Sequence, residues 1–146
     1  MSANTTTIHQ LLEEKGRDVW AIDPDDSVFN AVTQMAIKDV GGLLVLEDEN
    51  IVGIITERDY TRNVILKGKT SSETPVCEIM SDNVICAKPE QTVSECLEIM
   101  TEKRIRHLPV VDNDRLVGIV SIGDLVKRII TDQQTAIEEL ENASQS

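Results

Sequence analysis

The chain has 146 residues and a formal net charge of −12, with 14 Lys and Arg against 26 Asp and Glu. This length fits a compact protein whose core is large enough to fold unaided, and it leaves little room for a separate catalytic domain. The acidic balance argues against nucleic acid as a partner, because affinity for DNA or RNA depends on neutralising phosphates with basic side chains. Without an apolar run of 18 residues, and with a polar N-terminus, the sequence predicts a soluble, cytoplasmic protein with no membrane contact.

Cysteines and histidines give no sign of a metal site or of catalysis. Cys77, Cys86 and Cys96 are odd in number and lack C-x-x-C spacing, which argues against disulfides and a zinc ribbon. His9 and His107 form no H-x-x-x-H pair, and neither a G-x-S-x-G elbow nor a G-x-x-x-x-G-K-S/T loop is present. We therefore expect no metal site, no catalytic residue and no enzymatic activity.

The chain contains an internal repeat. Residues 19–59 align without gaps with residues 84–124, at an offset of 65. The matched pairs include Pro24 with Pro89, Met35 with Met100, Gly53 with Gly118 and Asp59 with Asp124. Two copies predict two similarly folded units.

Each copy begins with a lead, a strand and a helix. Short amphipathic leads occupy Ile8–Leu12 and Val76–Met80, and short strands are expected at 19–22 and 84–87, each stopped by a proline. Ser27 and Thr92 are then placed as N-caps of helices. The apolar face of each helix is expected to comprise Val28, Ala31, Val32, Met35 and Ala36, or Val93, Cys96, Leu97 and Met100.

The second half of each copy predicts a hairpin and a final helix. The strand pairs are 43–46 with 51–55 and 108–111 with 116–120. The final helices start at Thr56 and Ser121, and the first should run to Lys67 and stop at Gly68, before a polar linker over 69–74. After Asp124 the helical pattern continues, and the sequence leaves open whether this end packs on a second chain or frays in solvent.

The predicted fold class is α+β, with strand, helix, strand, strand and helix in each unit. The first unit should span residues 7–68 and the second 74–130, with a helical or frayed tail at 131–146. A unit of about 60 residues buries only about 60% of its surface and is marginal alone. We therefore expect the two sheets to pack on each other about a pseudo-twofold axis.

In both copies, a hydroxyl side chain and a carboxylate side chain three residues apart lie where a strand ends and a helix begins. Thr56 with Asp59 is the first motif and Ser121 with Asp124 is the second. Free backbone amides and the positive end of the helix dipole make such a corner suitable for binding a ligand. The same spacing is also that of a helix capping box, and the residues alone leave both roles open.

The repeated elements resemble a known family. The segments G-I-I-T-E-R-D and G-I-V-S-I-G-D, with R-H-L-P-V-V at 106–111, resemble a pair of CBS domains, a Bateman module, of the small stand-alone kind. The resemblance covers about residues 7–130. It implies that an adenosine nucleotide such as AMP, ADP, ATP or NAD binds between the domains as a regulatory ligand. It also implies a homodimer and an unidentified regulated protein.

The resemblance further implies which residues form the site. Thr56 and Asp59 head one cleft and Ser121 and Asp124 the other, with the adenine lying on apolar strand residues. The first cleft would also include Arg58, Ile105, Arg106 and His107. The second cleft would include Val40, Gly41 and Gly42. The apolar residues expected to contact the ligand are Ile22, Ala87 and Pro109. We expect phosphate in the first cleft, because Arg106 and His107 are basic. The alternative is a ligand-free interaction scaffold in which both motifs are only helix caps.

Overall fold

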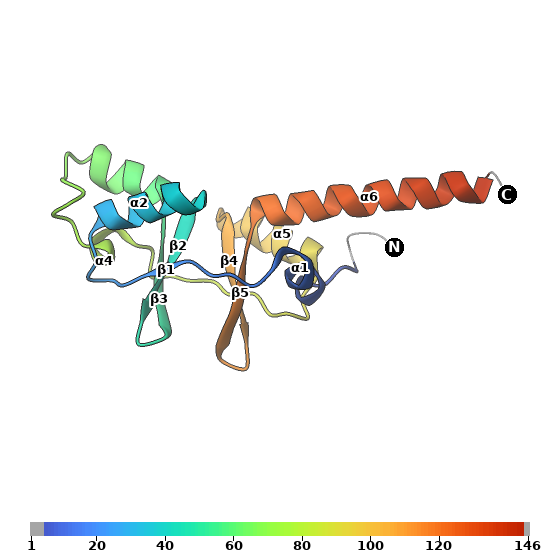
Figure 1. The fold of residues 1–146 in the computed structure, drawn as a ribbon, viewed down its shortest axis with the longest axis horizontal. Coiled ribbons are helices and arrows are strands. Elements are labelled where there is room, and N and C mark those ends of the chain that lie inside the picture. Colours follow the sequence, from blue (N-terminus) through green and yellow to red (C-terminus); the bar gives the residue numbers. More distant parts are fainter. Residues whose placement is uncertain (1–4, 145–146) are drawn as a thin grey trace. The chain divides into compact units, whose positions relative to one another are not determined.

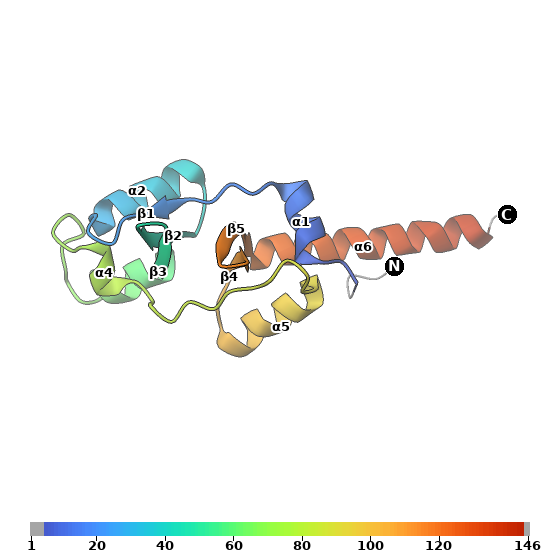
Figure 2. The ribbon, with the colours of Figure 1, turned by 90° about the horizontal axis from the view of Figure 1, so that it is seen from below.

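The computed structural model describes residues 5–144 and divides the chain into two compact units. One unit is Val19–Val84, and the other combines the segment up to Asp18 with Ile85 onwards. The elements of both are labelled in Figure 1 and seen from below in Figure 2. Each unit therefore contains one copy of the repeat, and the second unit also contains the first lead.

The unit Val19–Val84 has a three-stranded sheet in the order β1-β2-β3. β1 (Ala21–Ile22) runs parallel to β2 (Gly42–Glu47), which pairs antiparallel with β3 (Asn50–Thr56). The helical elements are α2 (Val28–Lys38), α3 (Glu57–Tyr60), the π-helical turn η1 (Thr61–Ile65) and α4 (Val76–Ile79). The core consists of Ile22, Val28, Ala31, Met35, Leu43, Val45, Ile55, Val64, Val76 and Ile79.

The other unit repeats the hairpin and the helix before it. β4 (His107–Asp112) pairs antiparallel with β5 (Arg115–Ser121), and α5 (Val93–Lys103) precedes them. α1 (Ile8–Lys15) and α6 (Ile122–Ser144) complete the unit. The core consists of Ile8, Leu11, Leu12, Ala87, Val93, Cys96, Met100, Leu108, Val110, Val120 and Leu125.

The two leads are exchanged between the repeats. α1 precedes the first repeat but bonds to the second, where Ile8 N donates to Gln91 O over 2.8 Å. α4 precedes the second repeat but bonds to the first, where Val76 N donates to Asp26 O over 2.8 Å. Because Asp26 and Gln91 occupy matching positions of the repeat, the two leads dock in the same way.

The glycine that opens each motif accommodates the docked lead. A Cβ on Gly118 would lie 2.8 Å from Leu12 Cδ2, and one on Gly53 would lie 2.5 Å from Met80 Sδ. Real Cβ atoms do not approach other atoms this closely. The docked leads therefore favour glycine at the start of both G-I-I-T-E-R-D and G-I-V-S-I-G-D.

The α+β class, both hairpins and both N-caps are confirmed. The strand expected at 84–87 is wrong, since Ala87 makes only an isolated bridge to Val110. In the first repeat, Leu44 N donates to Trp20 O over 3.1 Å and helps to hold β1 in the sheet. Pro109 occupies the matching position and has no N–H to donate, so this ladder bond is missing in the second repeat.

After the first motif, the helix and the linker differ in detail from those expected from the sequence. The helix expected to reach Lys67 changes to π-helical pairing at Thr61, where Leu66 N donates to Thr61 O over 3.0 Å. Gly68 does adopt the left-handed conformation, with φ +67°. The expected linker is packed only at its end: Thr74 is 5% exposed, and its carbonyl accepts from Val28 N at the start of α2.

Two further comparisons with the expected structure concern the apolar face of α2 and the length of α6 (Ile122–Ser144). Ala36 is exposed and does not belong to the apolar face of α2. α6 is helical without a break from Ile122 to Ser144, and in both views its far half extends beyond α1 and α5 (Figures 1 and 2). The last two residues of the expected tail lie outside the described residues. The packing of the two sheets on each other stays a prediction.

Candidate functional site

The first motif forms a reciprocal helix cap at the end of β3. Thr56 Oγ1 accepts from Asp59 N at 3.2 Å. Asp59 Oδ2 accepts from Thr56 N at 2.9 Å and from Thr56 Oγ1 at 3.0 Å. The capping role proposed for this pair is therefore present in the structure.

The second motif forms the same two reciprocal capping bonds with backbone amides at the start of α6. Asp124 Oδ2 accepts from Ser121 N at 2.8 Å, and Ser121 Oγ accepts from Asp124 N at 3.1 Å. In both motifs the hydrogen bonds that the carboxylate accepts end on Oδ2, and among the described residues no hydrogen bond reaches Oδ1 of either Asp59 or Asp124. Each carboxylate thus caps its helix with one oxygen and keeps the other as an acceptor.

A lysine distinguishes the second motif from the first. Lys15 Nζ, in the last turn of α1, lies 3.2 Å from Asp124 Oδ2 and donates to Ile119 O over 2.8 Å. Lys15 and Asp124 are 26% and 28% exposed, so the ion pair is mostly shielded but reachable from solvent. Within residues 5–144, no ion pair involves Asp59.

Sequence reasoning missed Lys15, although the two leads differ in length. In the first repeat, Ile54 O accepts from the backbone amide of Ser81 over 2.9 Å. Ile54 matches Ile119, so the Lys15 ammonium takes the place of a main-chain donor. α1 has eight residues and α4 has four, and this extra length is the signal that could have pointed to Lys15.

Within each unit, the segment before the hairpin lies beside that unit's own motif. In the first repeat, Gly41 O accepts from Glu57 N over 3.1 Å, and Gly42 pairs with Thr56. In the second, Arg106 O accepts from Ile122 N over 2.8 Å, and His107 pairs with Ser121. The contacts expected across the repeats, of the first motif with Arg106 and His107 and of the second with Gly41 and Gly42, join different units and stay predictions.

The remaining predicted site residues lie near these corners. Val40 N and Ile105 N close the ends of α2 and α5 by donating to Met35 O and Met100 O, each over 3.0 Å. Arg58 is exposed on α3. Ile22 and Ala87 belong to the cores of their units, and Pro109 is buried as well.

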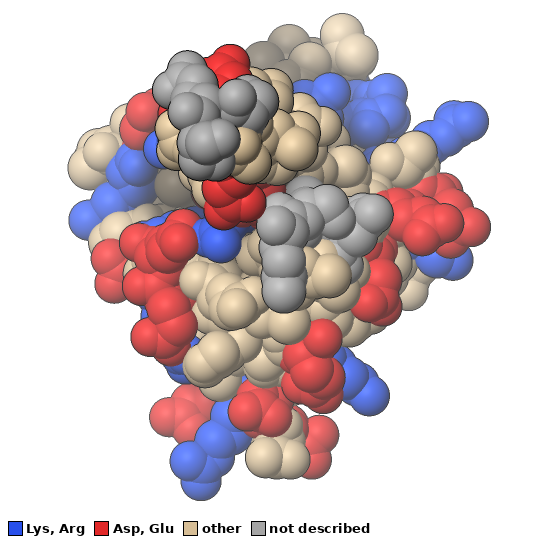
Figure 3. Space-filling view, turned by 90° about the vertical axis from the view of Figure 1, so that its right-hand side faces the viewer, with Lys and Arg blue, Asp and Glu red and all other residues tan. Residues whose placement is uncertain are grey.

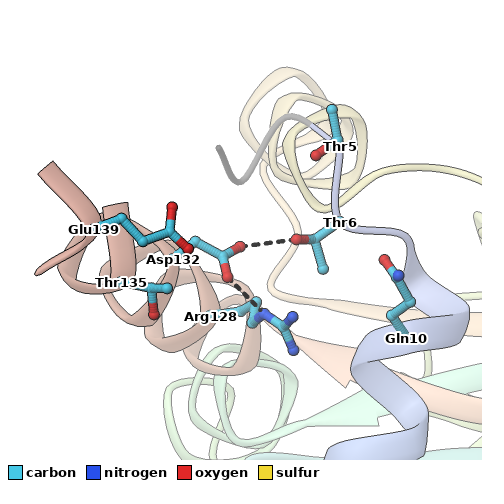
Figure 4. A pocket seen from close by; sticks show the side chains of 7 residues that line it. All are labelled: Thr5, Thr6, Gln10, Arg128, Asp132, Thr135 and Glu139. Carbon is cyan, nitrogen blue, oxygen red and sulfur yellow. Dashed lines mark hydrogen bonds and ion pairs between the residues drawn. The ribbon is translucent and has the colours of Figure 1, made fainter. Parts of the chain in front are cut away.

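A polar hollow of about 390 Å³ lies elsewhere in the unit that contains α6. Figure 4 shows its lining side chains: Thr5, Thr6, Gln10, Arg128, Asp132, Thr135 and Glu139. Thr6 Oγ1 donates to Asp132 Oδ2 over 2.8 Å, Arg128 Nε donates to Asp132 Oδ1 over 3.0 Å, and Arg128 also pairs with Glu14. Burial would lower the pKa of Arg128, but the hydrogen bonds and charges of Asp132 and Glu14 outweigh it and raise that pKa. The network fastens α6 to α1 and contains no predicted site residue.

Neither the charges on one face of the protein nor the metal-binding side chains of residues 5–144 indicate a second site. The face drawn in Figure 3 carries acidic and basic side chains interspersed with one another. Among residues 5–144, no group of three His, Cys, Asp or Glu side chains is arranged to hold a metal ion. No helix in the described part of the chain is long and apolar enough to span a membrane.

Comparisons with known proteins agree on one family. A family model described as "CBS domain" matches residues 16–65 and 76–131. The CBS domain-containing protein CBSX3, mitochondrial, of Arabidopsis thaliana is 36% identical over an alignment 146 positions long. The match covers 93% of this chain and 70% of that protein. The solved structure of a protein with CBS domains from Burkholderia ambifaria MC40-6 is 46% identical, with a TM-score of 0.86 and coverage of 88% and 96% of the two chains.

A second similar solved structure contains ligands. It is the CBS domain pair of protein MJ0100 in complex with 5′-methylthioadenosine and S-adenosyl-L-methionine. That pair is 25% identical to this chain, with a TM-score of 0.77 and coverage of 88% and 98% of the two chains. From the repeated fold, the two matching motifs and these similarities, the chain belongs to the CBS-domain family and carries a pair of CBS domains.

Proposed function

We propose that this protein is a regulatory module that binds an adenosine nucleotide, such as AMP, ADP, ATP or NAD, and thereby modulates a partner protein. The observation that carries the proposal is the repeated corner in which Asp59 or Asp124 caps a helix with Oδ2 and leaves Oδ1 as an acceptor. Because the cap is made by one oxygen only, capping and ligand binding are compatible roles of the same carboxylate.

The chemistry of the corner suits a ribose. A carboxylate can accept hydrogen bonds from the 2′ and 3′ hydroxyls, and each such charge-assisted bond contributes about 1.5 to 3 kcal/mol. The hydroxyl of Thr56 or Ser121 lies beside the first turn of the following helix, where backbone amides favour an anionic group. The complexes of the MJ0100 pair with two adenosine compounds support this ligand class.

Regulation would follow from the paired architecture. A ligand that contacts both domains favours the arrangement for which it has the higher affinity, and it shifts the population by that difference. No catalytic step is part of the proposal, since the carboxylate and the hydroxyl of each motif are already engaged in capping bonds. The regulated partner is a separate protein.

The completeness of the caps favours a second candidate, a ligand-free interaction scaffold. All the capping bonds of both motifs form without a ligand. Under this alternative, losing an Asp would lower stability by about 1 kcal/mol, the cost of a lost cap, and added nucleotide would change nothing.

We further propose a homodimer in which α6 pairs with α6 of a second copy. Val126, Ile130, Ile137 and Leu140 are 42%, 55%, 55% and 72% exposed. With Gln133 they follow the alternating four- and three-residue spacing of a coiled-coil seam.

Charge complementarity favours an antiparallel pair. Residues 122–131 contain one acid and two bases, whereas residues 132–144 contain four acids and no base. An antiparallel arrangement places Lys127 of each helix near Glu141 of the other. A parallel arrangement would bring the two acidic halves together and cost repulsion.

A thermal-shift screen of the full chain tests nucleotide binding. AMP, ADP, ATP, NAD and S-adenosylmethionine would be compared with guanosine as a purine control. At about a hundredfold excess over its dissociation constant, a true ligand stabilises the folded state by about 2.7 kcal/mol. No shift with any adenosine compound would contradict the proposal and favour the scaffold.

A further inference from the structure

Lys15 sets the second motif apart in charge, and this difference bears on which ligand each motif takes. The first motif carries two acids in its first helical turn, Glu57 and Asp59, with the exposed Arg58 between them. In the second motif, Ile122 takes the place of Glu57 and Gly123 that of Arg58. Lys15 forms an ion pair with the carboxylate of Asp124. The local charge is therefore negative at the first motif and balanced at the second.

We propose that the second motif binds the nucleotide that carries phosphate, and that Lys15 gives it this preference. The proposal rests on the proposed nucleotide-binding function and specifies the ligand class of one motif. It differs from the sequence expectation, which placed phosphate at the first motif through contacts across the repeats.

The geometry of Lys15 suits this role. An ammonium has three N–H donors, and those of Lys15 reach Ile119 O and Asp124 Oδ2, which leaves one donor for a ligand. Both acceptors hold Nζ in place, so binding an anion need not immobilise a free side chain. At 26% exposure, the ammonium is partly desolvated, which strengthens its attraction to an anion while solvent access is kept.

The neighbouring segment within the same unit carries basic residue types. Arg106 O accepts from Ile122 N, and His107 pairs with Ser121 across the hairpin, so the backbone of two residues with basic side chains adjoins the second motif. The matching neighbours of the first motif are Gly41 and Gly42, which carry no charge. α6 also presents its N-terminus here, and its 23 residues give it the longer helix dipole.

Lys15 also has a structural role, which the experiment must separate from ligand binding. Its bond to Ile119 O replaces the bond that Ser81 N makes to Ile54 O in the first repeat. A purely structural lysine would affect every ligand of the second motif alike. A lysine that contacts phosphate would affect ligands according to their charge.

Calorimetric titrations of full-length Asp59→Asn protein would isolate the second motif. The amide oxygen introduced by this substitution can still accept from Thr56 N, so the cap is retained without the charge. Adenosine, AMP and ATP would be titrated into this background, alone and combined with Lys15→Met or Lys15→Arg. Arg115→Met, at the opposite end of β5, removes the same charge as a matched control.

ATP is expected to bind the second motif more tightly than adenosine, and Lys15→Met should lower the ATP affinity by about tenfold, the effect of one charge-assisted bond. Adenosine affinity should stay unchanged, Lys15→Arg should restore ATP binding, and Arg115→Met should have no effect. Equal losses for adenosine and ATP would show a structural role only. A gain of ATP affinity in Lys15→Met would show that Lys15 competes with the ligand.

Two outcomes separate this proposal from the proposed function. If wild-type protein binds none of the three compounds and no adenosine compound shifts its melting temperature, the proposed function itself is contradicted. If wild type binds them but Asp59→Asn protein does not, nucleotide binding stands and the assignment of phosphate to the second motif is overturned.

Discussion

At the residue scale, the carboxylates of Asp59 and Asp124 have two roles. Sequence reasoning weighed the capping box against the ribose clamp and allowed that both roles can coexist, and the structure shows that the carboxylate makes the cap with Oδ2 only. The pairing of hydroxyl and acid could be predicted because the spacing is local. The extra length of the first lead distinguishes Lys15, but its contact with Asp124 could not be predicted, because this contact joins positions far apart in sequence and depends on where α1 docks.

Cys96 provides a residue-scale prediction. It is 0% exposed, and burial, with a smaller contribution from the charge of Glu95, raises its pKa to about 11. In native protein at neutral pH, a thiol reagent should therefore modify the exposed Cys77 and Cys86, and should reach Cys96 only after unfolding. Modification of all three thiols in native protein at the same rate would contradict the assignment of Cys96 to the core.

The same thiol makes stability depend on pH. The unfolded thiol ionises near 9, whereas the folded thiol stays protonated up to a pKa of about 11. Its contribution is complete below pH 9 and is lost as the pH rises through this window, at about 1.4 kcal/mol per pH unit. Denaturant titrations should show this slope in wild type and a shallower slope in Cys96→Ala.

At the element scale, the exchange of the two leads determines the glycine positions. A Cβ at Gly53 would meet both Met80 Sδ and the backbone carbonyl of Ser81, the latter at 2.9 Å. A Cβ at Gly118 would meet only the flexible end of Leu12. Gly53→Ala should therefore cost about 1 to 3 kcal/mol of unfolding free energy, and Gly118→Ala less.

Urea titrations of the two glycine variants would test this ranking. Leu12→Ala should relieve most of the added cost of Gly118→Ala, because it removes the atoms in conflict. Met80→Ala should relieve only part of the cost of Gly53→Ala, because the carbonyl of Ser81 remains. Equal costs, or complete relief in both pairs, would show that the leads do not dock as described.

The elements themselves were largely predictable, and the exceptions have physical causes. Hairpins, N-caps and helix faces follow from short-range patterns. The strand expected at 84–87 is reduced to a bridge because Pro109 cannot donate the bond that Leu44 makes. The amphipathic leads were recognised, but an apolar face does not identify the surface that it will cover, so their exchange required the structure.

At the scale of the whole molecule, α6 provides the test of self-association. Sedimentation analysis of wild type should give the mass of two chains, and Ile137→Glu should give one, because it places a charge in the apolar seam. Asn142→Glu adds the same charge to the opposite face of α6 and should remain dimeric. A dimeric Ile137→Glu variant would show that α6 is not the interface.

The central claim is that the two capped corners bind adenosine nucleotides. Its most direct test is equilibrium binding of AMP, ATP and NAD to wild type and to the double variant Asp59→Asn with Asp124→Asn, with Asp48→Asn in the β2–β3 turn as the control. We predict saturable binding to wild type and control, an affinity about tenfold or more weaker in the double variant, and unchanged melting without ligand. Absent binding to wild type, or equal affinity in the double variant, would contradict the account.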